Sequence, residues 1–297
     1  MLSSLKEFVL VKIIDPAVGL LPGSAKAHLV GHSLGREALE SVARNSGREA
    51  LAATYLRGEG IEVGGLNAPL RVPAGVGVKY VDLVDVDELQ KSYPGVEIKR
   101  PDIVANGETL ECVEDESQDF VIANHFLEHC EDPIRALKNF LRVVRRGGVI
   151  FVAIPDKRFT FDVRRGVTTF EHLLRDHEDG GAGSRLGHFE DYHRVVLGID
   201  DERQIRRDVE EMGHTHYHVW TQVEMLELVV RLRKDLGLDF EIEAFLSNRT
   251  LGEGIIVLRK GAAKNTAEDE LSCINVVRED YRKRYPDFEY KGALHDG

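Results

Sequence analysis

The stretch from Asp119 to Pro155 decides the fold, and it reads DFVIANHFLEHCEDPIRALKNFLRVVRRGGVIFVAIP. Its first apolar run, residues 120–123, is long enough only for a buried strand, and a second run covers residues 149–154. Between the two runs, apolar residues recur at the spacing of an amphipathic helix; they are Ile134, Leu137, Leu141 and Val144. A strand, a helix and a strand of this length predict a βαβ unit, in which parallel neighbouring strands are joined by a right-handed crossover.

The helix between the two strands carries its own start and stop signals. Pro133 is suited to the first helical position, and Asp132 before it can cap the free N–H groups of the first turn. Gly147 and Gly148 follow the last apolar position, so we expect this pair to end the helix.

Open parallel sheets bind ligands beyond the carboxyl ends of their strands, which lie here at Asn124–His125 and Pro155–Asp156. The whole stretch resembles the second half of a class I S-adenosylmethionine-dependent methyltransferase domain: a strand ending in a polar pair, Leu-Glu-His, Asp-Pro, a helix, Gly-Gly, and a strand ending near Pro-Asp. The resemblance is to the branch that methylates small molecules. It implies S-adenosylmethionine as cofactor and an α/β fold, a Rossmann-like doubly wound sheet that is mostly parallel with a terminal antiparallel strand.

The charge of the chain bears on its partners. Lys and Arg number 39 and Asp and Glu 51, so the formal net charge is −12, whereas binding to a phosphate backbone needs a basic surface. The charge therefore predicts no nucleic-acid partner, and the resemblance implies a small-molecule acceptor.

Cysteine usage and hydropathy bear on location. Cys112, Cys130 and Cys273 have no CxxC spacing, which favours a reducing cytoplasm with neither a structural disulfide nor a zinc site, and we assign no metal ligands. No apolar run approaches the roughly 20 residues of a membrane span, so we expect no membrane span, and contact of the N-terminal segment with a membrane surface is only an alternative. The apolar residues within 5–14 instead predict a helix docked on the domain or on a second subunit, as in a homodimer.

We divide the chain into three parts. Residues 1–57 read as a helical N-terminal extension that covers one flank of the sheet, residues 58–260 as the Rossmann-like domain, and residues 261–297 as a C-terminal tail. Within the domain, residues 156–218 form an insertion after the fifth strand, here called the insertion, which we expect to cover the ligand end of the sheet and hold the acceptor. Gly180–Ser184 would be its flexible joint.

The pattern after the insertion predicts the end of the domain. Residues 221–236 have helical spacing and are followed by Gly237. Apolar and polar residues alternate over residues 240–245, and residues 254–259 are mainly apolar. A short polar loop joins the two segments, which predicts an antiparallel hairpin.

A glycine pair follows the first predicted strand, at Glu62-Val63-Gly64-Gly65. Glycine permits positive φ and a close approach of the backbone to a ligand. The resemblance assigns Glu62, Gly64 and Gly65 to the loop around the amino-acid end of the cofactor. Later positions depart from the family pattern, because Asn67–Pro69 replaces further glycines and Pro69 disfavours an immediate helix start. A plain chain turn is the alternative.

Acidic residues near the next two strand ends are the candidates for the nucleoside. Asp82, or else Asp85, would accept hydrogen bonds from the ribose hydroxyls, although either could simply cap the following helix. By the resemblance, Asp102 or Glu108 would accept from the adenine amine and Ile103 would line the ring. A solvated acidic loop is the alternative for this segment.

Asn124 and His125 close the fourth strand and, by the resemblance, face the transferred methyl group. His129 follows His125 by four residues, a spacing that also suits a metal pair, but Leu-Glu-His is usual in the family and His129 reads as structural.

Three histidines alternate at His214, His216 and His218, so in an extended segment all three point the same way. Histidine titrates near neutrality and is the first candidate to deprotonate an acceptor hydroxyl. We assign His216 and His218 as catalytic candidates together with His125, with help from His188 or His193. The alternatives are a metal site with Glu190 or Asp191, and a polar structural strand.

These observations predict a methyltransferase that moves a methyl group from S-adenosylmethionine to an oxygen of a small polar molecule, such as a sugar or a secondary metabolite. Two hypotheses compete with it. The altered glycine loop suits a non-catalytic binding or scaffold protein on the same fold, and the His214/His216/His218 cluster suits a metal-dependent enzyme.

Overall fold

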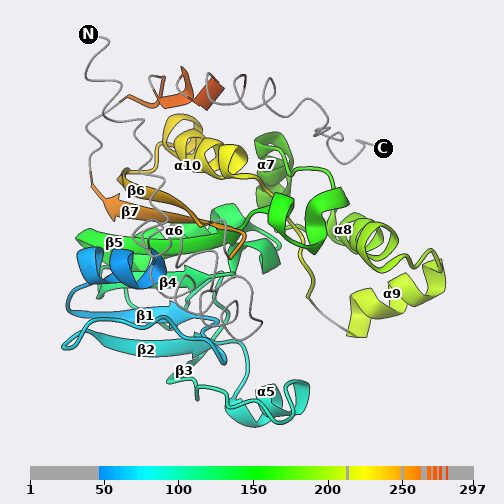
Figure 1. Ribbon diagram of the computed structural model, residues 1–297, viewed down its shortest axis with the longest axis horizontal. Coiled ribbons are helices and arrows are strands. Elements are labelled where there is room, and N and C mark those ends of the chain that lie inside the picture. Colours follow the sequence, from blue (N-terminus) through cyan, green and yellow to red (C-terminus); the bar gives the residue numbers. More distant parts are fainter. Residues whose placement is uncertain are drawn as a thin grey trace, which may run out of the picture.

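In the computed structural model, the described residues are 47–211, 214–248 and 251–261, plus residues 266–268, 270–272, 274, 275 and 279. Seven strands in these ranges form one sheet of order β3-β2-β1-β4-β5-β7-β6 (Figure 1). The strands are β1 (Glu59–Val63), β2 (Gly77–Asp82), β3 (Ile103–Val104), β4 (Gln118–Asn124), β5 (Val144–Pro155), β6 (Phe240–Asn248) and β7 (Glu253–Lys260). β1 to β5 pair in parallel, and β7 runs antiparallel between β5 and β6. The predicted doubly wound sheet and its closing hairpin are confirmed.

The two faces of the sheet are covered by different helices. Along β4, Val121 and Ala123 face a core that includes α6 (Pro133–Val143) and α10 (Gln222–Leu236). Phe120 and Ile122 alternate to the other face, where they meet the helix over residues 47–55. Because side chains alternate along a strand, a fully apolar run such as this one needs cover on both faces.

The start of α6 is confirmed and its predicted end is wrong. Asp132 caps the helix by accepting a hydrogen bond from the Arg135 N–H at 2.8 Å. The helix ends at Val143, and Val144 already begins β5. The glycine pair lies inside β5, where the pairing with β4 shifts register. Gly147 has φ +81°, and a Cβ on Gly148 would lie 2.7 Å from the Asp119 carbonyl oxygen, so both positions require glycine.

The N-terminal half of the domain is poor in helices. The connection from β1 to β2, residues 64–76, contains turns and no helix, as Pro69 suggested. The third strand is only two residues long. α5 (Val86–Ser92) is capped by Asp85, whose carboxylate accepts from the Val86 N–H at 2.6 Å.

The insertion is helical and lies on the side toward which the arrows of β1 and β2 point (Figure 1). Its elements are η2 (Lys157–Phe159), η3 (Phe161–Arg164), α7 (Phe170–Asp179), α8 (Arg185–Tyr192), the π-helical turn η4 (His193–Leu197) and α9 (Glu202–Glu211). The predicted extension over residues 1–57 lies outside the described residues up to residue 46, and so does most of the predicted tail. The described residues of the extension do pack on the sheet, through Ala52 and Leu56.

Candidate functional site

Glu62 of β1 contacts the inner side of the glycine loop that follows this strand. This carboxylate is 1% exposed, and its two oxygens lie 2.9 and 3.1 Å from the Leu70 N–H, which donates to them. Burial raises the pKa of Glu62 to about 7, although the Leu70 hydrogen bond opposes the rise. Gly64 has φ +68°, and a Cβ on Gly65 would lie 3.2 Å from the Tyr80 ring. Glu62 therefore shapes the loop from the inside.

The ends of β2 and β3 combine one acid with exposed apolar side chains. Asp82 is the last residue of β2, pairs with Val104 across the ladder, and accepts the Leu83 N–H at 2.8 Å. Leu83 is 64% exposed and Val104 55% exposed. A carboxylate beside apolar surface suits the hydroxyls of a ribose and the flat face of a base.

The residues that were predicted to contact adenine make other contacts in the structure. Ile103 packs against the core, so by alternation the next residue, Val104, faces outward and is the better candidate to line the ring. Asp102 precedes β3, and its carboxylate accepts the Tyr80 N–H at 2.8 Å, so it is committed to the neighbouring strand. Glu108 is held by Arg135 at 2.7 Å.

Asn124 ends β4 at the centre of the sheet. It lies close enough to Glu62 to lower the pKa of that carboxyl. Yet its amide oxygen and nitrogen are both buried without a hydrogen bond of good geometry to any residue that the structure describes. A buried polar group needs a partner, so this amide is a place for a ligand to bind. With Asp82, Leu83 and Val104, these strand ends fit S-adenosylmethionine.

His125 forms a dyad with a glutamate from the far end of the chain. Its φ is +50°, and its Nε2 lies 2.9 Å from Oε2 of Glu253. Glu253 is fully buried and also accepts hydrogen bonds from Arg48 and Asn248. Burial alone would raise the pKa of Glu253, but the hydrogen bonds from His125 and Arg48 lower it below its ordinary value. The His125 ring remains 41% exposed.

His216 forms a second dyad nearby. Its Nδ1 lies 2.7 Å from Oδ2 of Asp162, and Arg165 holds the other oxygen of that carboxylate at 2.9 Å. The His216 ring packs edge-on to His129, with centroids 4.7 Å apart. Glu128 adjoins both dyads: its Oε1 is 4.0 Å from His125 Nδ1, and its ligand oxygen lies within 4.8 Å of those of His129 and His216.

Glu128 itself is a buried carboxylate with unused bonding capacity. It is 2% exposed, and burial raises its pKa. Neither of its oxygens makes a hydrogen bond within the described part of the chain. A carboxyl group in this state is unusual outside functional sites.

The expectation that His214, His216 and His218 point the same way is wrong. Residues 214–219 adopt no regular strand, and His218 turns away from His216 toward Asp176, whose Oδ2 is 3.7 Å from the His218 Nε2. His218 is 0% exposed, so it cannot reach an acceptor, and its assignment as a base is corrected.

The other residues that were predicted to help are also engaged elsewhere. His188 is buried beside His218, and His193 bonds Asp208 at 2.8 Å. Glu190 pairs with Arg194, and Asp191 with Arg165. The metal site predicted from Glu190 or Asp191 is therefore not assembled as expected. Asp82 and Asn124 end β2 and β4, His125 follows β4, and His216 contacts Asp162 and His129.

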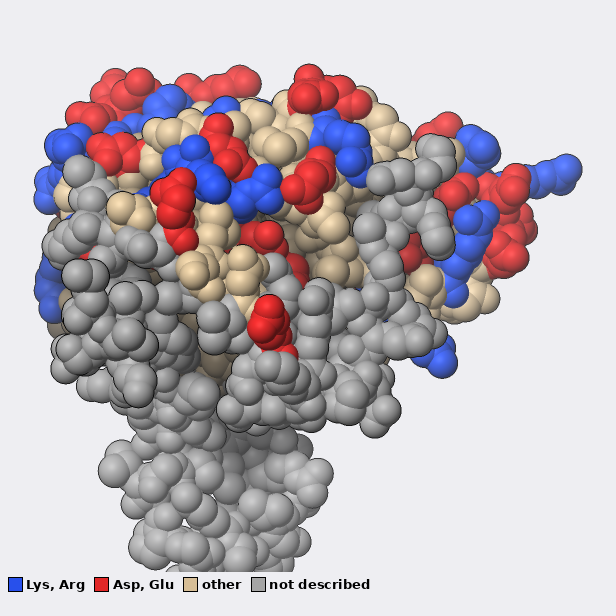
Figure 2. All heavy atoms as spheres, turned by 90° about the horizontal axis from the view of Figure 1, so that it is seen from above, with Lys and Arg blue, Asp and Glu red and all other residues tan. Residues whose placement is uncertain are grey.

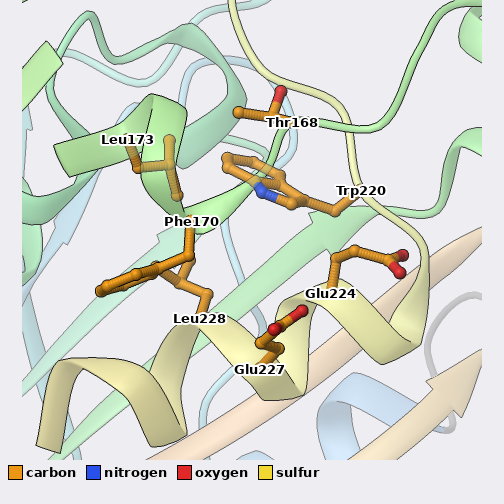
Figure 3. A pocket seen from close by; sticks show the side chains of 7 residues that line it. All are labelled: Thr168, Phe170, Leu173, Trp220, Glu224, Glu227 and Leu228. Carbon is orange, nitrogen blue, oxygen red and sulfur yellow. The ribbon is translucent and has the colours of Figure 1, made fainter. Parts of the chain in front are cut away.

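A small pocket adjoins Trp220, whose backbone bridges Asp156 at the end of β5 (Figure 3). Side chains of α7 and α10, with two from the adjoining segments, line it: Thr168, Phe170, Leu173, Trp220, Glu224, Glu227 and Leu228. It contains none of the residues discussed in the preceding paragraphs, so we assign it no role. On the face drawn in Figure 2, Lys and Arg are interspersed with Asp and Glu and gather into no basic patch. Among the described helices, none has the length and apolar character to cross a bilayer.

The comparisons with known proteins are consistent with the order of the strands in the sheet. Residues 61–152 match the family model of the methyltransferase domain. A Methanocaldococcus jannaschii protein of unassigned function is 30% identical over 113 residues, which are 37% of this chain and 50% of that protein. The match thus spans about half the length of this relative.

Solved structures resemble the chain at low similarity. A Methanosarcina mazei S-adenosylmethionine-dependent methyltransferase is 20% identical with a TM-score of 0.38, covering 70% of this chain and 96% of that one. The Haemonchus contortus phosphoethanolamine N-methyltransferase 1, bound to phosphoethanolamine and S-adenosylhomocysteine, is 12% identical with a TM-score of 0.41, covering 78% and 46%. At these scores the strand order and the family match carry the assignment. Residues 61–152 therefore match a methyltransferase domain, and the order of the strands in the sheet is consistent with that match.

Sequence reasoning missed several residues at the ligand end. Glu128 lies in the Leu-Glu-His motif, which indicated the family resemblance but no role for this carboxylate. Glu253 could have been found, because the first residue of an antiparallel β7 must lie beside the carboxyl end of β5, and it pairs with Pro155. Asp162 had no signal, since only the fold brings it to His216.

Proposed function

We infer that the protein transfers a methyl group from S-adenosylmethionine to a hydroxyl oxygen of a small polar molecule, such as a sugar or a secondary metabolite. The observation that carries this proposal is the His216–Asp162 contact of 2.7 Å beside the carboxyl ends of β4 and β5. A hydroxyl acceptor needs a base more than an amine does, and a histidine oriented by a carboxylate is such a base.

Some residues of the chain would hold the cofactor, and others would deprotonate the acceptor. When bound, S-adenosylmethionine supplies a methyl group made electrophilic by its sulfonium. Asp82 and Asn124 would hold the nucleoside, and Gly64 and Gly65 give backbone access to its amino-acid end. His216 donates from Nδ1 to Asp162, so its Nε2 can take the proton of the acceptor hydroxyl. His125, fixed by Glu253, is the second candidate for the same step.

The base assignment is tested by replacing His216 with glutamine. With labelled S-adenosylmethionine and a panel of hydroxylated small molecules, His216→Gln should lower kcat by about 10²-fold or more. Cofactor affinity in calorimetric titration should stay unchanged, because His216 lies outside the strand ends that hold the nucleoside. His214→Gln, an exposed neighbour, is the control. Full turnover in His216→Gln and in His125→Gln, or products methylated only on nitrogen, would overturn the proposal.

The cofactor site is tested at the end of β2. Asp82→Ala should weaken S-adenosylmethionine binding by about tenfold or more, since a charge-assisted hydrogen bond contributes roughly 1.5–3 kcal/mol. Asp85→Ala should leave the affinity unchanged and only destabilise the protein, because Asp85 caps α5. Equal effects of the two variants would contradict the assignment.

A scaffold role on the same fold is the second candidate, and the helix-free connection after the glycine loop favours it. If the wild-type protein gives neither heat nor a thermal shift with S-adenosylmethionine, the scaffold role replaces the enzymatic one.

A further inference from the structure

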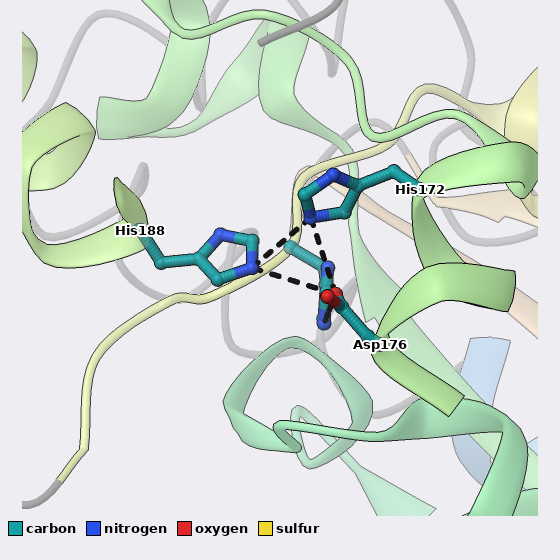
Figure 4. Close-up of side chains that lie close together, drawn as sticks. His172, Asp176 and His188 are labelled. Atoms are coloured by element: carbon teal, nitrogen blue, oxygen red, sulfur yellow. Dashed lines mark hydrogen bonds and ion pairs between the residues drawn. The ribbon is translucent and has the colours of Figure 1, made fainter. Parts of the chain in front are cut away.

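Four ligand-type side chains converge inside the insertion, apart from the dyads described above. Figure 4 labels three of them, His172, Asp176 and His188. His172 and Asp176 lie one turn apart on α7 and share one face of that helix. His188 comes from α8, and His218 from the segment before α10. All three imidazoles point an Nε2 at the same oxygen, Oδ2 of Asp176, at 3.1, 3.5 and 3.7 Å respectively.

The spacing of these atoms matches a tetrahedral metal site. With metal–ligand bonds of about 2.0–2.1 Å, ligand atoms at the corners of a tetrahedron stand about 3.3 Å apart. The three separations from Oδ2 scatter around that value, and Nε2 of His172 lies 3.1 Å from Nε2 of His188. The side chains would need only small adjustments to surround one ion.

The cluster is buried and incompletely bonded. Asp176 and His188 are 2% exposed and His218 is 0% exposed. In the described part of the chain, the Nε2 of His218 has no hydrogen-bond partner, although it points into the cluster. Burying three imidazoles and one carboxylate away from water costs free energy unless their polar atoms have bonding partners. A bound cation is such a partner.

A second layer of contacts holds the carboxylate in place. The Ser184 hydroxyl donates to Oδ1 of Asp176 at 2.5 Å, which leaves Oδ2 for the metal. Binding at the Nε2 of His172 would put its proton on Nδ1. The Arg175 guanidinium, now 3.3 Å from that nitrogen, would then turn outward to solvent.

We propose that His172, Asp176, His188 and His218 bind one Zn²⁺ ion. Three neutral imidazoles and one carboxylate in a closed, buried set are the donors and the surroundings of a structural zinc site. The ion would fasten α7 and α8 to the segment 214–220, and so fix the insertion on the domain. The cysteine pattern could not indicate this site, because its ligands are histidines brought together by the fold.

The first test measures the metal directly. Full-length protein carrying no polyhistidine tag is analysed by inductively coupled plasma mass spectrometry. The wild type should contain about one zinc per chain, and His188→Gln and Asp176→Asn should fall to background. His177→Gln is the matched control: it lies on α7, pairs with Asp132, and should keep its zinc. Zinc absent from the wild type and not taken up when added, or retained equally by all variants, would overturn the proposal.

A second measurement covers the case in which the ligand variants fail to fold. Wild-type protein is stripped with a chelator and reloaded with Co²⁺, whose visible absorption reports ligand number and geometry. A tetrahedral nitrogen and oxygen spectrum, together with a higher Tm than the stripped protein, is the expected result. An octahedral spectrum or an unchanged Tm would contradict a buried four-ligand site. Neither readout depends on methyl transfer, so this proposal and the proposed function can fail separately.

Discussion

Glu62 makes the stability of this protein depend on pH. Its folded pKa of about 7 lies above the ordinary 4.5, because burial disfavours the carboxylate. The folded state therefore holds the proton more tightly than the unfolded state. The contribution of Glu62 to the free energy of unfolding should be highest below pH 4.5, fall as the pH rises to about 7, and stay level above it. At about 1.4 kcal/mol per pH unit, the loss is about 3 kcal/mol.

The variant Glu62→Gln isolates this effect. Glutamine keeps an acceptor for the Leu70 N–H and cannot ionise, so the variant should gain on the wild type by about 3 kcal/mol between pH 4.5 and 7. Urea titrations across that range measure it. The exposed Glu97→Gln serves as control. Parallel curves for Glu62→Gln and the wild type would show that the carboxyl is not perturbed as described.

Single residues also show where sequence reasoning stops. Asp82 and Asp85 were both candidates for the ribose, and the structure separates them because only Asp85 caps a helix. The alternation of His214, His216 and His218 predicts a common direction in an extended segment, but the segment is irregular. His216 and His218 consequently enter different clusters, a division set by Asp162 and Asp176, which no local pattern connects to them.

Among the elements, β5 depends on a glycine that looked like a helix terminator. A Cβ on Gly148 would lie 2.6 Å from Val144 Cγ1 and 2.7 Å from the Asp119 carbonyl oxygen, and the backbone oxygen cannot move aside. Gly148→Ala should therefore cost about 2 kcal/mol or more in the free energy of unfolding. Gly187→Ala, in α8 with open space around it, should be neutral or stabilising by up to about 1 kcal/mol. Denaturant titration compares them, and equal losses would contradict the steric account.

Elements with strong periodicity and a cap were predictable, such as α6 and α10, because their signals are local. The short β3 was not predictable, because two residues are too few to show the alternation of a strand. The end of α6 was misplaced because glycine can end a helix or accommodate an irregular strand, and only the pairing of β4 with β5 decides between them.

In the molecule as a whole, the order of the strands brings distant residues to one edge. The βαβ unit and the final hairpin could be predicted from the sequence. Glu253 lies beside His125 because β7 is placed between β5 and β6 in the sheet. The sequence predicted the ligand end of the sheet and several residues on it. It could not predict which carboxylate orients which histidine, because those pairs join segments far apart in the chain.

The place of Trp220 gives this molecule a built-in optical reporter. It is the single tryptophan among 297 residues, is fully buried, and stacks on His218 with ring centroids 5.6 Å apart. Its backbone also bridges Asp156 at the end of β5. Indole fluorescence, excited without any label, therefore originates at the junction between the insertion and the sheet. Any event that displaces either side of that junction should change the emission of one identifiable ring.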